Sequence, residues 1–119
     1  MGLRIPIKLI KGNKQLQVEA LLNTGFETME PLISIPITIA ETLKLKPRKP
    51  LTFEGPGLTR GTAYQAGEVT IEVSQQDTIR RLNAKAIITI GEEEVVLSDK
   101  CIEQLGIVID LKGKRWWLT

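Results

Sequence analysis

Short segments in which apolar and polar residues alternate recur along this chain, and they constrain its fold more than any other feature. The first covers residues 3–9, and the alternation resumes over residues 16–20 after the dipeptide Gly12-Asn13. An alternation with a period of two is typical of a strand that buries one face, and a Gly-Asn pair is typical of a turn. Residues 3–22 are therefore predicted to form a β-hairpin.

The rest of the chain repeats this plan of short strands and tight turns, interrupted by two short helices. Residues 36–45 are predicted to form the first helix, and Ser98 or Asp99 to cap the second, which Gly106 ends. The set predicts one all-β domain over residues 1–119, either a small barrel or a sandwich. The remaining strands are predicted at residues 31–35, 51–53, 62–73, 79–90, 95–97, 107–109 and 116–118.

The absence of histidine and the presence of one cysteine, Cys101, remove several kinds of site. Zinc sites built from histidine and cysteine, Ser-His-Asp and Cys-His catalytic groups, and an internal disulfide are all excluded. With 42% hydrophobic residues in a chain of 119, a core can form without metal or disulfide. Cys101 is predicted to be a small buried hydrophobic residue, and no cofactor is expected.

The charge balance argues against nucleic acid as a partner, because 16 basic residues face 14 acidic ones and the net charge is only +2. Residues 112–115 hold the densest basic cluster. They adjoin Trp116 and Trp117, which could stack on single-stranded bases. We favour the alternative of a charged turn leading into a strand whose tryptophans pack, one of them at an interface between subunits.

No segment predicts a membrane partner or a secreted protein. The first ten residues alternate instead of forming the apolar run of a signal peptide, and no stretch approaches the ~18 apolar residues of a membrane span. A cytoplasmic protein is expected. The acidic run Glu92–Glu94 could bind a hard cation, but neighbouring side chains on a strand point to opposite sides, so a solvated turn and no metal site are expected.

Two motifs carry the chemistry. Residues 20–25 read Ala-Leu-Leu-Asn-Thr-Gly, with polar residues and a glycine directly after an apolar strand. They resemble the Ala-Leu-Leu-Asp-Thr-Gly active-site loop of aspartic proteases. Residues 97–106 read Leu-Ser-Asp-Lys-Cys-Ile-Glu-Gln-Leu-Gly, and they resemble the retropepsin stretch hydrophobic-Gly-Arg-Asn/Asp-Leu-Leu-x-x-Leu-Gly.

Two further features fit the same family. Residues 36–45 look like the helix that follows the active-site loop in single-domain cellular and archaeal relatives, and the glycine-rich residues 55–61 stand where retroviral proteases have their flap. The chain thus resembles the retropepsin-like aspartic proteases (clan AA) over almost its whole length. The resemblance implies a retropepsin-like closed β-barrel, the acid protease fold, with one or two short helices.

The resemblance also implies a homodimer that acts on a peptide or protein substrate. In the family each subunit supplies one loop, and the two loops meet at a two-fold axis, where carboxylates about 3 Å apart share one proton. Thr24 matches the threonine that hydrogen bonds across the axis, and Gly25 matches the glycine that lets the substrate backbone approach. Phe26 and Glu27 follow as substrate-binding residues of the loop.

Gly55, Pro56 and Gly57 match the tip of the flap by their position in the chain. In the family this hairpin closes over bound peptide and excludes water, so these three residues are assigned to substrate binding. A solvent-exposed turn is the alternative, because position and not a motif supports the assignment.

Asn23 occupies the position of the catalytic aspartate, and an amide cannot serve as a base near neutral pH. The water-activating group would be missing from both subunits, so the chain as written is expected to be an inactive aspartic endopeptidase. The asparagine could be engineered, or natural in a relative that kept binding and lost cleavage. The alternative function is a non-catalytic peptide- or protein-binding module on the same fold, which clamps a partner by strand addition.

The second motif departs from the family pattern at Ser98, Asp99 and Lys100. Retroviral relatives have an arginine near Asp99 that pairs with an acidic residue after the loop, which is Glu27 here. We therefore expect repulsion between Asp99 and Glu27, with Lys100 or Arg4 compensating, and a dimer contact unlike the retroviral one. A nucleophilic role for Ser98 is not favoured, because the chain has no histidine.

Overall fold

The computed structural model describes residues 2–55 and 58–119, and of residues 52–55 and 58–62 it describes only the backbone. In these ranges the chain forms strands joined by short turns, with two one- to two-turn helices. In chain order the elements are β1 (Leu3–Lys11), β2 (Lys14–Leu22), β3 (Leu32–Ile35), α1 (Ile37–Thr42), β4 (Pro50–Gly55), β5 (Leu58–Gln75), β6 (Thr78–Thr89), β7 (Val95–Leu97), α2 (Asp99–Gln104), β8 (Ile107–Asp110) and β9 (Arg115–Leu118).

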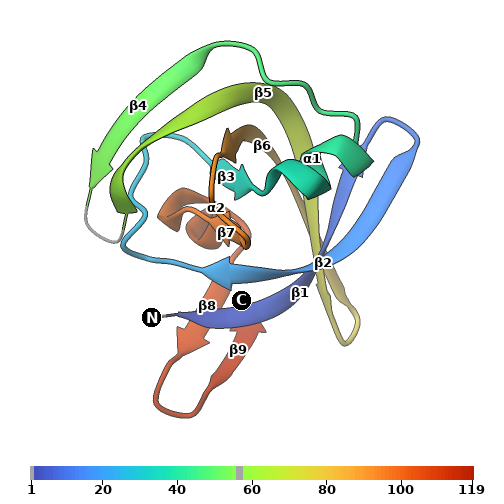
Figure 1. Cartoon of the computed structure of the whole chain (residues 1–119). Coiled ribbons are helices and arrows are strands. Elements are labelled where there is room, and N and C mark those ends of the chain that lie inside the picture. The colour runs from blue at the N-terminus through green and yellow to red at the C-terminus, as the bar shows by residue number, and fades with distance from the viewer. Residues whose placement is uncertain (1, 56–57) are drawn as a thin grey trace.

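Seven strands form one sheet that closes on itself (Figure 1). Their order is β1-β2-β7-β3-β6-β5-β4, and β1 also pairs with β5, so six strands complete a barrel and β4 lies outside it against β5. Most neighbours are antiparallel, but β7 runs parallel to β2 and β6 runs parallel to β3. The prediction of an all-β domain is confirmed, and of the two alternatives the barrel is the one formed.

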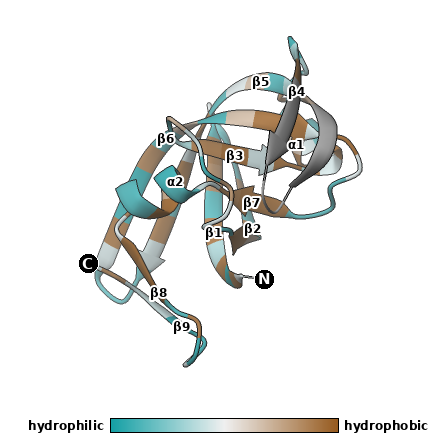
Figure 2. Ribbon diagram, turned by 90° about the vertical axis from the view of Figure 1, so that its left-hand side faces the viewer, coloured by the Kyte–Doolittle hydropathy of each residue, from teal (hydrophilic) through white to brown (hydrophobic). Residues whose placement is uncertain are grey.

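The N-terminal hairpin follows the predicted pattern. β1 and β2 pair over their full lengths, and Gly12 in the turn has the left-handed backbone (φ +60°) that glycine adopts without strain. Every second residue of β1 is buried, namely Ile5, Ile7 and Leu9. Bands of hydrophobic and hydrophilic residues accordingly alternate along the barrel strands (Figure 2).

The β4–β5 hairpin differs from the sequence prediction. The sequence predicts strands at residues 51–53 and 62–73 with a bent loop at residues 54–57, but β4 continues to Gly55 and β5 already begins at Leu58. These two residues are cross-strand partners, so both strands are longer than predicted. The ladder with the neighbouring strand outweighs the local preference of glycine for loops.

A bulge in β5 turns this long strand toward the barrel. The register with β6 shifts between Gln65 and Glu68, and Gly67 between them has φ +84°. A bulge of this kind bends a strand and increases its twist. Before the bulge β5 pairs with β4, and after it residues 70–72 pair with β1, so one strand serves both the outer hairpin and the closure of the barrel.

Both helices lie where the sequence predicts them, although α1 is shorter than residues 36–45. Pro36 stands at the N-cap of α1. Ser98 caps α2 by accepting a hydrogen bond from the Cys101 N–H, and Gly106 (φ +72°) follows the last turn. Among the described residues, no helix is long and apolar enough to cross a membrane.

β8 and β9 form a separate two-stranded sheet that projects from the barrel (Figure 1). The Gln75 side chain ties it to the end of β5: it donates to the Trp116 carbonyl at 2.8 Å and accepts from the Leu118 N–H at 3.1 Å. Trp116 packs against the main core, whereas Trp117 is 42% exposed. The predicted final hairpin is confirmed, and a subunit interface at one tryptophan stays a prediction.

Two hydrophobic clusters fill the molecule. The larger one occupies the barrel and is almost entirely aliphatic, and Cys101 lies fully buried in it, as predicted. The smaller one lies between the β4–β5 hairpin and the segment after β2. Its members are Phe26, Ala63, Ile87 and Val96, with Leu21, Leu32 and Leu51 packed against them.

One ion triad spans the place where the barrel closes. Glu72 of β5 is the cross-strand partner of both Lys8 in β1 and Arg81 in β6, and its side chain is only 10% exposed. A Glu72 carboxylate oxygen lies 2.7 Å from Arg81 Nε, and the other lies 3.5 Å from Lys8 Nζ. The hydrogen bond from Arg81 and, secondarily, the Lys8 charge hold the pKa of Glu72 below its ordinary value, against the opposing effect of burial.

We expect Glu72→Gln to lower the melting temperature at neutral pH, because the substitution removes the charge that joins β1 to β6 through β5. A carboxyl whose pKa is lowered by folding stabilises the fold fully above its ordinary pKa of 4.5, and this contribution is lost as the pH falls through the lower folded value. The difference between the two proteins should therefore shrink in acid. Glu19→Gln, on an exposed site of β2, is the matched control. Equal melting temperatures at pH 7 would contradict a stabilising triad.

Candidate functional site

Asn23 lies where two strands of the barrel end together. β2 and β7 run parallel, with Leu22 beside Leu97, so both strands end at the same edge of the sheet. The Asn23 N–H continues this pairing by donating to the Leu97 carbonyl at 3.4 Å. The position of Asn23 is thus set by the sheet and not by the loop alone.

The segment that follows turns back on itself through the Asn23 side chain. Asn23 Oδ1 accepts a hydrogen bond from the Gly25 N–H at 3.0 Å, and the Asn23 carbonyl accepts one from the Phe26 N–H at 3.0 Å. This is an Asx-type turn, which asparagine and aspartate form equally well because both offer the same acceptor oxygen. The loop geometry is therefore compatible with either residue at position 23.

The other predicted loop residues differ in exposure. Thr24 and Glu27 are exposed, and Gly25 is half-buried. Phe26 is only 8% exposed, because its ring packs against Ala63 of β5 in the smaller hydrophobic cluster. The structure thus brings the loop against the base of the β4–β5 hairpin, while leaving Thr24 and Glu27 accessible to a partner.

Ser98 fastens the far end of this segment to α2. Its buried hydroxyl accepts hydrogen bonds from the Leu32 N–H at 3.1 Å and from the Cys101 N–H at 3.4 Å. Its own N–H donates to the Leu32 carbonyl at 3.1 Å. Ser98 therefore joins the start of β3 to the start of α2, which is a structural role and not that of a nucleophile.

Asp99 binds the main chain in the middle of the loop. Its Oδ1 accepts hydrogen bonds from the Thr28 N–H at 2.9 Å and from the Lys100 N–H at 2.8 Å, and its N–H donates to the Phe26 carbonyl at 2.9 Å. The carboxylate accepts from a backbone donor of the loop, and the Asp99 N–H donates to a loop carbonyl, so Asp99 holds residues 26–28 by main-chain hydrogen bonds. Sequence reasoning weighed only side-chain charges and missed these main-chain donors.

The ion pairs of Lys100 and Arg4 differ from the expected compensation near Glu27. Lys100 pairs with Glu103 at 3.2 Å within α2, and Arg4 pairs with Glu94 at 2.5 Å across to the segment before β7. Each cation is engaged with a different acid from the one expected. Asp99 already accepts hydrogen bonds from two amide groups, so neither cation is needed to balance its charge near Glu27.

Cys101 lies directly behind the loop anchor. Its Sγ donates to the Leu32 carbonyl at 3.3 Å, and burial raises the pKa of the thiol above its ordinary value. A thiol with a raised pKa is a weak nucleophile near neutral pH. Cys101 therefore serves packing, as predicted.

Two residues assigned to the hairpin tip, Pro56 and Gly57, lie outside the described residues. The third, Gly55, is the last residue of β4 and pairs with Leu58. Leu51 and Ala63, at the base of the same hairpin, pack against the cluster that contains Phe26. The base of the hairpin therefore lies beside the loop after β2 (Figure 1).

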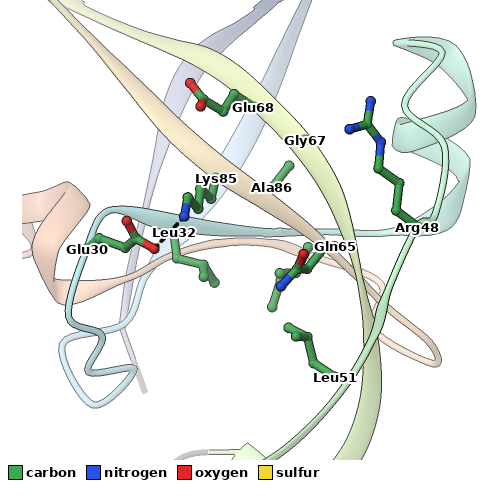
Figure 3. Close-up of a pocket in the computed structure, with 10 residues that line it drawn as sticks. Glu30, Leu32, Arg48, Leu51, Gln65, Gly67, Glu68, Lys85 and Ala86 are labelled. Carbon is green, nitrogen blue, oxygen red and sulfur yellow. Dashed lines mark ion pairs between the residues drawn. The ribbon is translucent and has the colours of Figure 1, made fainter.

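A hollow of about 230 Å³ opens next to this cluster, and no pattern in the sequence predicted it. Its apolar wall includes Leu32, Leu51 and Ile87. On one side Glu30 and Lys85 form an ion pair at 2.8 Å, and the Glu30 carboxylate raises the pKa of Lys85 (Figure 3). The Arg48 side chain lies on the opposite side of the hollow (Figure 3). Residues of four strands and two loops line this hollow, so no local motif in the sequence could predict it.

No group of three or more histidine, cysteine, aspartate or glutamate side chains within residues 2–55 and 58–119 is placed to hold a metal ion. The acidic run 92–94 forms an irregular connection between β6 and β7. Glu92 Oε1 there accepts from the N–H groups of Glu93 and Glu94 at 3.2 and 3.4 Å. The run thus closes its own turn, as the solvated-turn prediction required.

The chain matches no known family model and no curated protein sequence. Its fold is nevertheless found in solved structures. The retroviral protease-like domain of Ddi1 from Leishmania major is similar over 98% of this chain and 87% of that chain, with a TM-score of 0.61 and 15% identical residues. A retropepsin-like aspartic protease from Rickettsia conorii is similar over 90% of this chain and 76% of that chain, with a TM-score of 0.49 and 18% identity. The first likeness shows that this chain has a retropepsin-like fold.

We expect Ser98→Ala to destabilise the domain by about 1–3 kcal/mol, the usual cost of leaving buried hydrogen-bond donors without a partner. The Leu32 and Cys101 amides both lose their acceptor. Urea unfolding measures the effect, and Ser74→Ala, on an exposed site of β5, is the matched control. If both substitutions cost the same, Ser98 does not fasten the loop.

Proposed function

We propose that this retropepsin-like domain binds extended peptides between two copies of itself and does not cleave them. The class of site is that of an aspartic endopeptidase, and Asn23 removes its catalytic group. The observation that carries the proposal is the Asn23 turn: it stands at the paired ends of β2 and β7, closed by the bond from Gly25 to Oδ1 at 3.0 Å. A loop with the form of the catalytic loop is retained while its acid-base chemistry is lost.

The loss of activity follows from the chemistry of the side chain. Peptide hydrolysis by this class needs one ionised carboxylate to activate water and one protonated carboxyl to polarise the peptide carbonyl. An amide does not titrate in this range and offers no base. Two Asn23 side chains at a shared site would supply hydrogen bonds to a bound peptide but no proton transfer.

A homodimer is part of the proposal, because one chain carries one such loop and the site needs two. A two-fold arrangement places the same loop of each copy at the axis. Thr24 is exposed beside Asn23 and is available for a hydrogen bond to the partner loop. The Asp99 anchor supports the proposal as well, since a loop held by fixed main-chain bonds can meet its copy in one defined geometry.

Peptide binding is supported by the hairpin that stands beside the loop. β4 pairs only with β5 among the described strands, so its other edge is open to strand addition. In the proposal the β4–β5 hairpin acts as the flap, with Gly55, Pro56 and Gly57 at its tip, and covers a peptide that lies along residues 23–27. The apolar wall of the hollow, which includes Leu32, Leu51 and Ile87, would receive one of the peptide's side chains.

The proposal predicts that Asn23→Asp gains peptidase activity. On a mixed peptide library between about pH 3 and 7, where paired carboxylates titrate, cleavage should exceed that of the unmodified chain by about 10²–10⁴. The pH profile should be bell-shaped, and a statine-containing peptide should block the reaction as a transition-state mimic.

Asn13→Asp is the matched control, because it makes the same change in the exposed β1–β2 turn and should stay inactive. Sedimentation confirms in parallel that each variant is dimeric. If the Asn23→Asp dimer neither cleaves nor binds any peptide of the library, the proposed function is wrong. If it binds peptides and fails to cleave them, the endopeptidase class is wrong and the binding module remains.

A further inference from the structure

A basic hollow lies on the side of the barrel where the β1–β2 turn, the end of α1 and the start of β4 come together (Figure 1). Its volume is about 370 Å³. Its four cations come from two separate segments, the end of β1 and residues 44–48. Its apolar lining comes from the second of these segments and from β5. The lining residues are Lys11, Lys44, Leu45, Lys46, Pro47, Arg48 and Ala66.

The charge of this hollow is unusual for the molecule. None of its lining residues is acidic, and four of them are cationic, although the whole chain carries a net charge of only +2. Lys14 extends the cluster because it is the cross-strand partner of Lys11, and Lys49 follows Arg48 directly. Like charges gathered in a concave surface raise the local potential and attract anionic partners.

The backbone beneath these cations is fixed. The Arg48 N–H donates to the Gln65 carbonyl at 2.7 Å, and the Gln65 N–H donates to the Lys49 carbonyl at 2.9 Å. These two bonds hold residues 48 and 49 against β5 just before its bulge. Leu45 is only 5% exposed in the main core. Lys11 Nζ is itself held, since it donates to the Glu68 carbonyl at 2.9 Å. The cluster is therefore a shaped surface and not a set of lysines on a loose tail.

Lys44 occupies a position where glycine would cost less. The N–H groups of Leu45 and Lys44 close the last turn of α1 by donating to the carbonyls of Ala40 at 2.8 Å and Glu41 at 3.0 Å. In such a turn the residue at this position adopts the left-handed conformation, and it is usually glycine. Lys44 adopts it with φ +59°. A charged residue is thus kept at a strained site beside three other cations.

The basic hollow adjoins the hollow described above, beside Leu32 and Leu51, and Arg48 lines both. The geometry points to an acidic segment of the bound peptide as the occupant of the basic hollow. This inference rests on the proposed function: a peptide in the cleft would place an apolar side chain in one hollow and a run of Asp or Glu residues against Lys44, Lys46 and Arg48.

A polypeptide fits the basic hollow better than a nucleic acid does. Single strands are held by stacking of bases on aromatic rings, and none of the described residues that line the hollow is aromatic. The tryptophans lie on β9, on the far side of the barrel from α1 in both Figures 1 and 2. Immediately after Lys49 the chain enters β4, whose outer edge is open to an extended peptide.

The test compares two variants that each remove two lysines, one of them from a left-handed site. Lys44→Gly with Lys46→Gln alters the basic hollow, and Lys112→Gln with Lys114→Gly alters the β8–β9 turn, where Lys114 has φ +54°. A fluorescent ten-residue polyglutamate peptide is titrated against each protein at low and moderate salt. Kd should rise about three- to tenfold in the first variant, the loss expected for two exposed charge pairs, and less than twofold in the second.

Melting temperatures separate binding from folding. Lys44→Gly relieves a left-handed lysine, so the first variant should melt no lower than the unmodified protein, and a weaker Kd cannot then be attributed to unfolding. Equal losses in both variants would reduce the effect to overall charge and overturn the inference. Absence of polyglutamate binding at low salt, or tighter binding of a thymidine decamer than of polyglutamate, would overturn it too.

The proposed function is tested separately, by the cleavage of uncharged peptides by the Asn23→Asp dimer. One outcome is that these peptides are cleaved while the Lys44 and Lys46 changes leave polyglutamate binding unaffected. The inferred docking site for acidic segments would then be wrong, and the proposed function would stand. The other outcome is that polyglutamate binding depends on Lys44 and Lys46, but the protein neither binds nor cleaves uncharged peptides. The proposed peptide cleft would then be wrong, and the basic docking site would stand.

Discussion

The structure depends on a small set of hydrogen bonds between the start of α2 and the segment after β2. Ser98 holds the Leu32 backbone, and Asp99 holds the backbone of Phe26 and Thr28. β2, β7 and β3 are neighbours in the sheet although they are distant in the chain, and these bonds join the segments that connect them. Without them the connection of residues 23–31 would have no fixed course, and Asn23 would have no defined place at the end of the barrel.

The sequence predicted the strands and helices well where the local pattern agrees with the final packing. The N-terminal hairpin, the Ser98 cap and the terminal β8–β9 hairpin all follow from alternation or from turn chemistry, and all are present. The strands of the β4–β5 hairpin were predicted too short because its glycines favour bends locally, whereas pairing between strands extends the ladder to Gly55 and Leu58. The two hollows could not be predicted, since their walls combine residues from strands that meet only in the closed barrel.

The site shows the same division between local and distant information. A motif of six residues located the Asn23 loop, and the second motif located its anchor. The sequence prediction treated Asp99 only as a charge that faces other side chains. In the structure its carboxylate accepts a hydrogen bond from the Thr28 N–H. A motif predicts which segments form the site. Which main-chain N–H groups a side chain will bind can be predicted only when the path of the backbone is known. The basic hollow has a similar origin, since Lys11 and Lys44 come together only through the closure of the barrel.

The central claim is that two copies of this chain share one peptide, held over paired Asn23 loops. A peptide selected for binding from a random library, titrated into the unmodified protein in a calorimeter, tests it most directly. The account predicts one peptide bound for every two chains, with no cleavage product afterwards. One peptide bound per chain by a protein that sediments as a monomer would contradict it, as would a library from which no binding peptide can be selected.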